Sequence, residues 1–335
     1  MVISRTPFRI SFFGGGTDYP AWYRENGGAV LSTSINKYCY LTCRYLPPFF
    51  EHATRLVWSK VELVKNFDEI QHPSARETIK FLGIKDGLEI HHDADLPARS
   101  GLGSSSAFTV GLLNSLNTLL GRASDRKQLV LEAIQIEQER IKENVGSQDQ
   151  ASAAFGGLNK IEFGGPDHVC AKPIALDEDA AKSLENHVML FFTGFSRNAS
   201  EIAAEQIQLT PQKKKELTAM RGMVDVAVDL LKKGDFADFG KLLHESWQIK
   251  RTLSSRITNN SIDEIYEAGR HAGALGGKLL GAGGGGFIMF FARPEDQPQV
   301  REKLKNLLYV PVKFEKNGSQ IIFNSNDEGH HVRLS

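Results

Sequence analysis

The sequence is poor in cysteine and has neither a long apolar run nor an excess of charge of one sign. Its 335 residues include three cysteines, Cys39, Cys43 and Cys170, which form no CxxC pair. A scattered, odd-numbered set of this kind predicts free thiols in a reducing compartment, and we expect a cytoplasmic protein. No stretch reaches the roughly 18 apolar residues of a membrane helix. We also expect no secretory peptide, because charges and a proline interrupt the start MVISRTPFRISFF.

The charge of the chain is balanced, with 40 basic and 40 acidic side chains. No overall field then draws the protein to nucleic acid or to an anionic membrane, and we expect small-molecule partners. A hydrophobic content of 41% over 335 residues is enough for a large core, and the length predicts two domains, although one large α/β domain also fits. The composition leaves a monomer and a homodimer equally open.

Several common catalytic motifs are missing or incomplete. Both Gly-Lys pairs are followed by leucine, which excludes a Walker A loop, and the histidines include no HExxH pair for zinc. The stretch from Gly194 to Asn198 falls one glycine short of the GxSxG elbow of serine hydrolases. Gly281, Gly283 and Gly286 have dinucleotide-binding spacing, but they precede a strand-like run instead of joining a strand to a helix. Any nucleotide site is therefore of another kind.

Hydrophobic periodicity predicts a β-rich first third and a largely helical second half. Strands are expected at 2–13, 28–33, 37–46, 54–64, 87–93, 157–164, 168–175, 187–192, 287–291, 310–315 and 319–324. Helices are expected at 104–121, 125–143, 199–208, 211–233, 235–247, 261–272 and 300–308. We place a domain boundary near residue 180, which gives domains 1–180 and 181–335.

The most informative stretch runs from Leu96 to Ala107 and reads LPARSGLGSSSA. Gly101 and Gly103 keep side chains off the approach to the backbone, three serines follow, and an apolar helical pattern begins at once. Free N–H groups and the positive end of the helix dipole then converge, which makes an anion site. Taken alone, a glycine-serine loop before a helix is also consistent with a structural turn.

Two further stretches favour the anion site. Pro7 to Tyr19 reads PFRISFFGGGTDY and Gly277 to Phe287 reads GKLLGAGGGGF. In this order, the three motifs closely resemble those of the GHMP kinase family, which phosphorylates sugars and other small molecules. The resemblance implies a two-domain α+β fold, with an N-terminal domain like the second domain of ribosomal protein S5 and a C-terminal ferredoxin-like domain. It also implies an active site between the domains and Mg-ATP as the phosphoryl donor.

In such kinases the second motif wraps the ATP phosphates. The resemblance assigns this role to Arg99, Ser100, Gly101, Leu102, Gly103, Ser104, Ser105 and Ser106. Mg²⁺ prefers oxygen ligands, and by position we expect the hydroxyl of Ser105 to face it. Its carboxylate partner is Glu137 or Glu139, and the family's spacing before the catalytic aspartate favours Glu137. Residues two positions apart on a helix cannot share a face, so at least one of the two belongs to a solvated face.

The segment from Val145 to Gln150, VGSQDQ, resembles the family stretch that carries the catalytic aspartate. Asp149 is therefore the expected general base, which accepts the proton of the acceptor hydroxyl or orients that hydroxyl. Arg9 matches the arginine of the first motif, which can pair with Asp149 and neutralise charge on the transferring phosphoryl group. A buried arginine–aspartate pair without a catalytic role is the alternative.

The first motif carries most of the information about the acceptor. Galactokinases have Gly-Glu-His-x-Asp-Tyr where this chain has GGGTDY, which argues against galactose. The stretches GGGTD, ENVGSQDQ and TGFSR are most similar to family members that phosphorylate D-glycero-D-manno-heptose 7-phosphate at the anomeric hydroxyl, giving the 1,7-bisphosphate for nucleotide-heptose synthesis. Asp18 is the first expected sugar ligand, because one carboxylate can accept two hydroxyls. The other expected substrate-binding residues are Gly15, Gly16, Thr17, Arg197, Gly283 and Gly284.

A sugar phosphate also needs a basic site away from ATP. Arg197 is the first candidate, with Arg44 and Lys37 behind it, because an arginine fork suits a phosphate dianion. Each of the three is equally consistent with a surface charge. Three alternatives stay open: an anomeric kinase for a free sugar such as fucose, a non-catalytic sugar-binding homologue, and an isomerase or decarboxylase of the superfamily. We expect Trp58 and the strand at 54–64 to line the adenine pocket.

Overall fold

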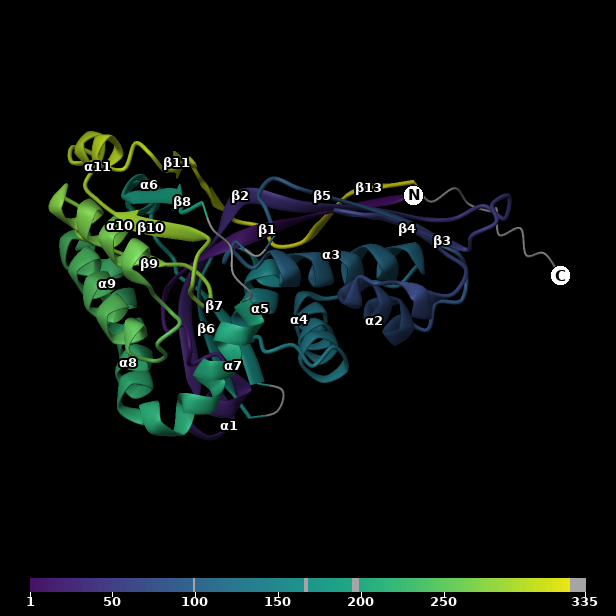
Figure 1. Cartoon of the computed structure of the whole chain (residues 1–335), viewed down its shortest axis with the longest axis horizontal. Coiled ribbons are helices and arrows are strands. Elements are labelled where there is room, and N and C mark those ends of the chain that lie inside the picture. The colour runs from purple at the N-terminus through teal and green to yellow at the C-terminus, as the bar shows by residue number, and fades with distance from the viewer. Residues whose placement is uncertain (99, 166–167, 195–198, 326–335) are drawn as a thin grey trace.

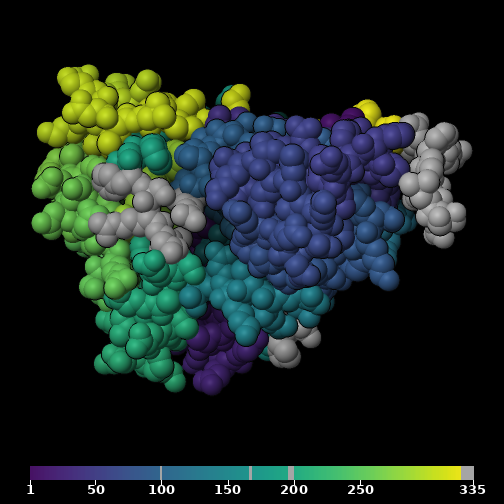
Figure 2. Space-filling model, turned by 45° about the vertical axis from the view of Figure 1, so that its right-hand side comes forward, coloured from purple at the N-terminus to yellow at the C-terminus, as the bar shows by residue number. Residues whose placement is uncertain are grey.

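The computed structural model describes residues 1–98, 100–165, 168–194 and 199–325. Within these ranges the chain forms a nine-stranded and a four-stranded sheet with helices packed on them (Figure 1). Figure 2 shows most of the first half, purple to teal, on one side of the molecule and the green and yellow second half on the other. Most of each half of the sequence thus lies on its own side of the molecule.

The larger sheet has the strand order β13-β1-β2-β5-β3-β4, with β12 and β6 also paired to β2 and β7 paired to β6. Its strands are β1 (Val2–Phe13), β2 (Gly28–Tyr45), β3 (Thr54–Val57), β4 (Val61–Val64), β5 (Leu88–Ala94), β6 (Leu158–Gly164), β7 (His168–Pro173), β12 (Phe314–Glu315) and β13 (Gln320–Asn324). β1 and β2 pair antiparallel, with Val2 opposite Cys43 and Phe13 opposite Leu31. These β-branched and aromatic strands suit a buried pleated surface and form the centre of the sheet.

Helices from the first half cover one face of this sheet (Figure 1). They are α2 (Pro73–Leu82), α3 (Ser104–Leu119), α4 (Arg126–Ile134), a π-helical turn (Gln135–Arg140) and α5 (Gln148–Phe155). The short α1 (Pro20–Asn26) and a 3-10 turn (Phe67–Glu69) lie in connections. α3 is mostly buried and packs on β1 and β2, where a Cβ on Gly111 would lie 2.7 Å from the hydroxyl of Thr6. Glycine there allows α3 to pack closely on β1.

The smaller sheet has the order β11-β8-β10-β9. Its strands are β8 (Val188–Phe192), β9 (Gly276–Leu279), β10 (Phe287–Phe291) and β11 (Leu308–Tyr309). The helices of this half are α6 (Glu178–Asn186), α7 (Ala199–Leu209), a 3-10 turn (Thr210–Lys213), α8 (Lys214–Lys233), α9 (Phe236–Arg251), α10 (Asn260–His271) and α11 (Gln297–Lys303). α9 packs on β9, while α8 also contacts β1 and β2. The second half therefore packs directly on the central strands of the first.

Aromatic side chains join the two halves. Phe12 and Phe13, at the end of β1, contact Phe239 of α9 edge to face, with ring centroids 5.6 and 5.2 Å apart. Edge-to-face pairs of this kind stabilise a core beyond the area that they bury. This contact holds the end of β1, and with it the first motif, against the helices of the second half.

Most predicted elements are confirmed, and the differences are local. The strands expected at 28–33 and 37–46 form one continuous β2, whereas the strand expected at 54–64 is the β3–β4 hairpin. The helix expected at 300–308 ends at Lys303, and Leu308 pairs with β8. Helices α1, α2, α5 and α6 were not expected, because runs of 7 to 10 residues carry little periodic signal.

Residues 314–324 complicate the division of the chain into domains. They contain β12 and β13, which leave the second half and pair with β2 and β1 of the larger sheet. The boundary near residue 180 stays a prediction.

The described helices include none with the length and apolar character needed to cross a bilayer. The three cysteines are free, and Cys39 and Cys43 are buried.

Candidate functional site

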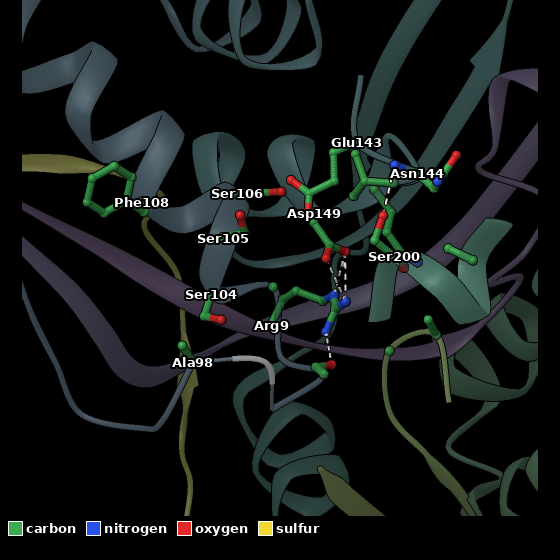
Figure 3. Close-up of a pocket in the computed structure, with 18 of the residues that line it drawn as sticks. Arg9, Ala98, Ser104, Ser105, Ser106, Phe108, Glu143, Asn144, Asp149 and Ser200 are labelled. Carbon is green, nitrogen blue, oxygen red and sulfur yellow. Dashed lines mark hydrogen bonds and ion pairs between the residues drawn. The ribbon is translucent and has the colours of Figure 1, made fainter. Parts of the chain in front are cut away.

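A cavity of about 430 Å³ lies where the two halves meet. Its wall is built from β1, the loop after it, the start of α3, the segment around the start of α5, and parts of α7, α9 and β9. The lining includes Arg9, Gly15, Gly16, Asp18, Gly101, Gly103, Ser104, Ser105, Ser106, Asp149, Lys250 and Lys278. The fold thus brings residues of all three sequence motifs to one place, part of which is drawn in Figure 3.

The loop before α3 turns sharply at this cavity. Gly101 and Gly103 have φ angles of 82° and 80°, a left-handed backbone that strongly favours glycine. A Cβ on Gly101 would collide with the carbonyl oxygen of Leu280, and one on Gly103 would lie 3.5 Å from the carboxyl carbon of Asp149. α3 begins at Ser104, so the unpaired N–H groups of its first turn and its positive dipole end lie at the wall. The geometry fits a bound anion.

The glycine-rich third motif lies directly against this loop. The N–H of Phe287 donates to the carbonyl of Ser100 over 3.1 Å, and a Cβ on Gly281 would lie 2.6 Å from Cα of Gly101. Gly281 and Ala282 line the cavity. Gly283 and Gly284 lie against Ile257 instead, with the N–H of Gly284 bonded to its carbonyl over 2.9 Å. The third motif therefore supports the loop more than it contributes side chains.

Arg9 and Asp149 form a two-pronged ion pair at the wall of the cavity (Figure 3). Nε and Nη2 of Arg9 donate to Oδ1 and Oδ2 of Asp149, each over 2.9 Å. Nη1 of Arg9 donates to the carbonyl of Gly101 over 2.6 Å, which ties the pair to the loop. The side chain of Arg9 is 3% exposed and that of Asp149 is 17% exposed. The carboxylate therefore keeps an open side toward the cavity.

Glu137 is buried behind the start of α3, within the π-helical turn. Its Oε2 accepts hydrogen bonds from Ser106 Oγ, over 2.8 Å, and from the amide of Gln150, while its buried Oε1 has no hydrogen-bond partner among the described residues. Burial raises the pKa of Glu137 to about 7, although the nearby hydroxyls of Thr109 and Ser106 oppose the shift. Glu139 is exposed, so the structure separates the two candidate carboxylates.

Of the three serines, Ser106 is the one that contacts Glu137. Ser105 is exposed at the cavity wall, and its carbonyl accepts a hydrogen bond from Thr109 over 3.2 Å. A rotation of about 100° per helical residue explains why adjacent serines face different directions. The structure thus brings together Glu137 and Ser106, one position after the expected Ser105.

Asp18 is buried beside the glycines of the first motif. Its Oδ1 accepts the N–H of Gly16 over 2.8 Å, and a Cβ on Gly146 would collide with its carboxylate. Burial raises the pKa of Asp18, and the nearby carboxylate of Asp149 raises it further. Gly15, Gly16 and Asp18 all line the cavity close to the carboxylate of Asp149. A small polar molecule there would meet two acidic side chains and exposed backbone.

Other predicted substrate residues lie elsewhere. The hydroxyl of Thr17 is shared between the carbonyls of Gly14, in the same loop, and Ala29, in β2. Thr17 is fully buried and is not among the described lining residues. Arg44 pairs with Glu89 on the larger sheet, and Lys37 is not among the described lining residues. Arg99 and Arg197 lie outside the residues that the structure describes.

Two lysines at the cavity were not predicted. Lys250, on α9, donates from Nζ to the carbonyl of Gly281 over 2.6 Å, and Lys278, on β9, donates to the carbonyl of Phe12 over 3.0 Å. Burial lowers the pKa of Lys250 to about 8 and lowers that of Lys278 strongly; neighbouring cations contribute in both cases. Lys278 could have been found from its place in the third motif. The sequence around Lys250 gives no such signal, because it resembles that of any amphipathic helix.

An aromatic cluster lines the end of the cavity beyond the serines. The rings of His72 and Phe108 stack with centroids 4.3 Å apart, Trp58 meets His72 edge-on at 4.9 Å, and His92 meets Phe108 edge-on at 5.2 Å. Burial lowers the pKa of His72 to about 4, so its ring is neutral at pH 7. This aromatic wall suits a planar ring of a ligand.

Comparison with known proteins gives the site its class. Residues 63–157 match the family model for the N-terminal domain of GHMP kinases, and residues 227–310 match the model for the C-terminal domain. Fold and site therefore define a kinase that transfers a phosphoryl group to a hydroxyl acceptor. The chain belongs to the GHMP kinase family and is a sugar kinase, and ATP is the co-substrate of that family.

Relatives extend over nearly the whole chain. D-glycero-alpha-D-manno-heptose 7-phosphate kinase of Campylobacter jejuni is 28% identical over 315 residues, covering 87% of this chain and 89% of its own. The crystal structure of a D-glycero-D-manno-heptose 1-phosphate kinase from Bacteroides thetaiotaomicron is 25% identical, with a TM-score of 0.77 and coverage of 97% and 100%. An L-fucokinase/L-fucose-1-P guanylyltransferase of Bacteroides fragilis is 25% identical over 92% of this chain and 36% of its own.

Proposed function

We propose that the protein transfers the γ-phosphoryl group of ATP to the anomeric hydroxyl of D-glycero-D-manno-heptose 7-phosphate, giving the 1,7-bisphosphate for nucleotide-heptose synthesis. The observation that carries the proposal is the Arg9–Asp149 pair beside the start of α3, because it sets a carboxylate next to an anion-binding helix end. The name of the Campylobacter jejuni relative supports the acceptor. The first motif, GGGTDY, supports it as well, since it lacks the Glu-His of galactokinases.

The loop before α3 would hold the triphosphate of ATP. Its left-handed glycines leave backbone N–H groups free to approach phosphate oxygens, and the dipole of α3 favours their charge. Ser100, Leu102, Ser104, Ser105 and Arg99 complete the proposed loop. The adenine ring would lie against the cluster of Trp58, His72 and Phe108, which is in line with the expectation for Trp58.

Mg²⁺ fits the pair of Glu137 and Ser106. Glu137 keeps a buried carboxylate oxygen without a partner next to a serine hydroxyl, and hard cations prefer such oxygen ligands. Ser105, exposed one position earlier, remains the alternative hydroxyl. When bound, Mg²⁺ would neutralise charge on the phosphates that the loop holds.

Asp149 would orient the acceptor hydroxyl and take its proton as the new bond to phosphorus forms. Arg9 fixes both carboxylate oxygens, so one direction of approach remains open toward the cavity. Because Arg9 also bonds the carbonyl of Gly101, the base and the phosphate loop keep a constant distance. Such fixed positioning supplies much of the rate enhancement in phosphoryl transfer.

The sugar would lie against Asp18, Gly15 and Gly16, with its hydroxyls bonded to the Asp18 carboxylate. Thr17 would act indirectly, by holding the loop in place through its backbone hydrogen bonds. Arg197 is the proposed clamp for the 7-phosphate. Gly283 and Gly284 would contribute only indirectly, because they lie against Ile257 and are not among the described lining residues of the cavity.

A second candidate is an anomeric kinase for L-fucose, favoured by the 25% identity to the fucokinase of Bacteroides fragilis over 92% of this chain. One experiment separates the two. Purified protein is supplied with Mg-ATP and either heptose 7-phosphate or free fucose, and ADP release is followed in a coupled assay. The proposal predicts much faster release with the heptose phosphate, and faster release with fucose would overturn it.

A further inference from the structure

Lys250 stands out among the basic residues of α9. Its side chain is 4% exposed, and within the described part of the chain its ammonium group forms no ion pair. Lys241 and Arg251 of the same helix pair with Asp238 and Asp263 at the surface. Of these three basic residues of α9, Lys250 is therefore the one whose charge lies inside the protein.

Burying that charge costs stability unless an anion compensates it. The carbonyl of Gly281 satisfies one of the three ammonium hydrogens, but a neutral donor would serve a carbonyl as well. A purely structural role therefore does not explain why the residue at this position is charged. A residue that meets a negative group during turnover does explain it.

Three basic and two acidic side chains, Lys250 included, meet at this part of the cavity. The groups that face Lys250 are Arg9 from β1, Asp18 from the loop after β1, Asp149 from α5 and Lys278 from β9. Arg9 and Asp149 compensate each other in their ion pair. Lys250 and Lys278 then face one carboxylate, Asp18, and burial lowers the pKa of both lysines and raises that of Asp18. An anionic ligand restores the balance.

The position of Lys250 indicates which anion this is. Its partner Gly281 lies against Gly101 of the phosphate loop, and the carbonyl of Gly101 accepts a hydrogen bond from Arg9. Lys250 and Arg9 therefore reach the junction of the two glycine loops from opposite halves of the protein. This junction borders both the start of α3 and the open side of Asp149.

We propose that Lys250 binds a phosphate oxygen in the cavity during the kinase reaction. The inference rests on the proposed function and adds a ligand from the second half of the chain to the site. A lysine ammonium is a compact point charge, which suits a non-bridging phosphate oxygen. The phosphate comes from one of two sources: the γ-phosphoryl group of ATP or the phosphate that the acceptor carries.

The test compares Lys250→Met with Lys241→Met, the matched control on the exposed side of α9. Rates of ADP release are measured over a range of ATP concentrations, with the sugar phosphate and with its unphosphorylated sugar. We expect Lys250→Met to lose roughly 10- to 100-fold in kcat/KM, the usual size for a charged hydrogen bond, and Lys241→Met to match the wild type. Equal losses with both acceptors would show that Lys250 binds the γ-phosphoryl group of ATP. A loss confined to the sugar phosphate would show that it binds the phosphate of the acceptor.

Unchanged kinetics of Lys250→Met with both acceptors would overturn the inference. The inference would also be overturned if Lys250→Met lost both activity and thermal stability and if Lys250→Arg did not restore part of the activity. If the wild type releases no ADP with any sugar, the proposed function fails by itself. Lys250 is then tested by titration of both variants with ATP and with inorganic phosphate. Weaker binding of either by Lys250→Met supports the inference, and equal affinities for both ligands overturn it.

Discussion

Arg9 and Asp149 stand 140 positions apart in the chain, yet two nitrogens of the guanidinium reach two oxygens of the carboxylate, each over 2.9 Å. Gly103, which opens α3, lies against both side chains, because a Cβ there would be 3.3 Å from Arg9 Cγ and 3.5 Å from the carboxyl carbon of Asp149. The ion pair thus couples the phosphate loop to the carboxylate that faces the acceptor.

Replacement of Asp149 by asparagine tests this carboxylate. Asp149→Asn should keep the fold and the affinity for ATP but lose about 10²- to 10⁴-fold in kcat, because the amide cannot accept a proton. Steady-state ADP release and direct titration with ATP measure the two quantities. The matched control is Asp263→Asn, which removes the carboxylate of an ion pair with Arg251 in the second half. Near-normal turnover of Asp149→Asn would leave the residue a positioning role at most.

The two candidate metal carboxylates are separated by Glu137→Gln and Glu139→Gln. The first should raise the Mg²⁺ concentration needed for half-maximal activity at least tenfold, because it removes the buried carboxylate beside Ser106. The second should have no effect, because Glu139 is exposed. An Mg²⁺ titration of activity decides between them. A larger effect from Glu139→Gln would show that Glu137 is not the metal ligand.

Glu137 also predicts how stability depends on pH without Mg²⁺. Its pKa is raised from 4.5 to about 7 in the folded protein, so its neutral form favours folding. This contribution is complete below pH 4.5 and is lost as pH rises through about 7, a change of about 3 kcal/mol in the free energy of unfolding. Urea unfolding at several pH values should show the decline in the wild type and a smaller one in Glu137→Gln. Parallel curves for the two proteins would contradict the assignment.

The phosphate loop can be tested with two glycines that share a left-handed backbone. Gly101 and Gly83 have φ angles of 82° and 69°, but only at Gly101 would a Cβ meet another part of the chain, the carbonyl of Leu280. Each alanine variant should lose about 1 kcal/mol from the backbone, and Gly101→Ala should lose more and raise KM for ATP. Thermal unfolding and ATP kinetics measure both effects. A KM for ATP that rises equally in both variants would count against the loop's role.

Much of the fold could be predicted, because β1 and α3 are long and strongly patterned and the three motifs lie within or beside them. Short helices could not, since α5 is eight residues of mostly small side chains that resemble a loop. Nor could the return of β13 to β1, which depends on pairing between the two ends of the chain.

Parts of the site could be predicted where the backbone conformation requires a particular residue type, such as glycine. Gly101 and Gly103 are such positions, whereas Arg9 and Asp149 were expected from the resemblance of their motifs to those of GHMP kinases. The structure brings all four together. The contact of Ser106 with Glu137 depends on one residue of helical rotation, which is set by where α3 begins. Lys250 was not predicted because a lysine on an amphipathic helix is usually solvated, and its burial depends on how α9 packs against the rest of the protein.

The most direct test of the account is the acceptor specificity of the purified enzyme. Mg-ATP is combined in turn with heptose 7-phosphate, other sugar phosphates, free fucose and free galactose, and the initial rate of ADP release is measured for each. We expect D-glycero-D-manno-heptose 7-phosphate to give the highest kcat/KM, and we expect the product to carry a second phosphate at the anomeric position. A free sugar as the best acceptor, or ADP release independent of any sugar, would contradict it.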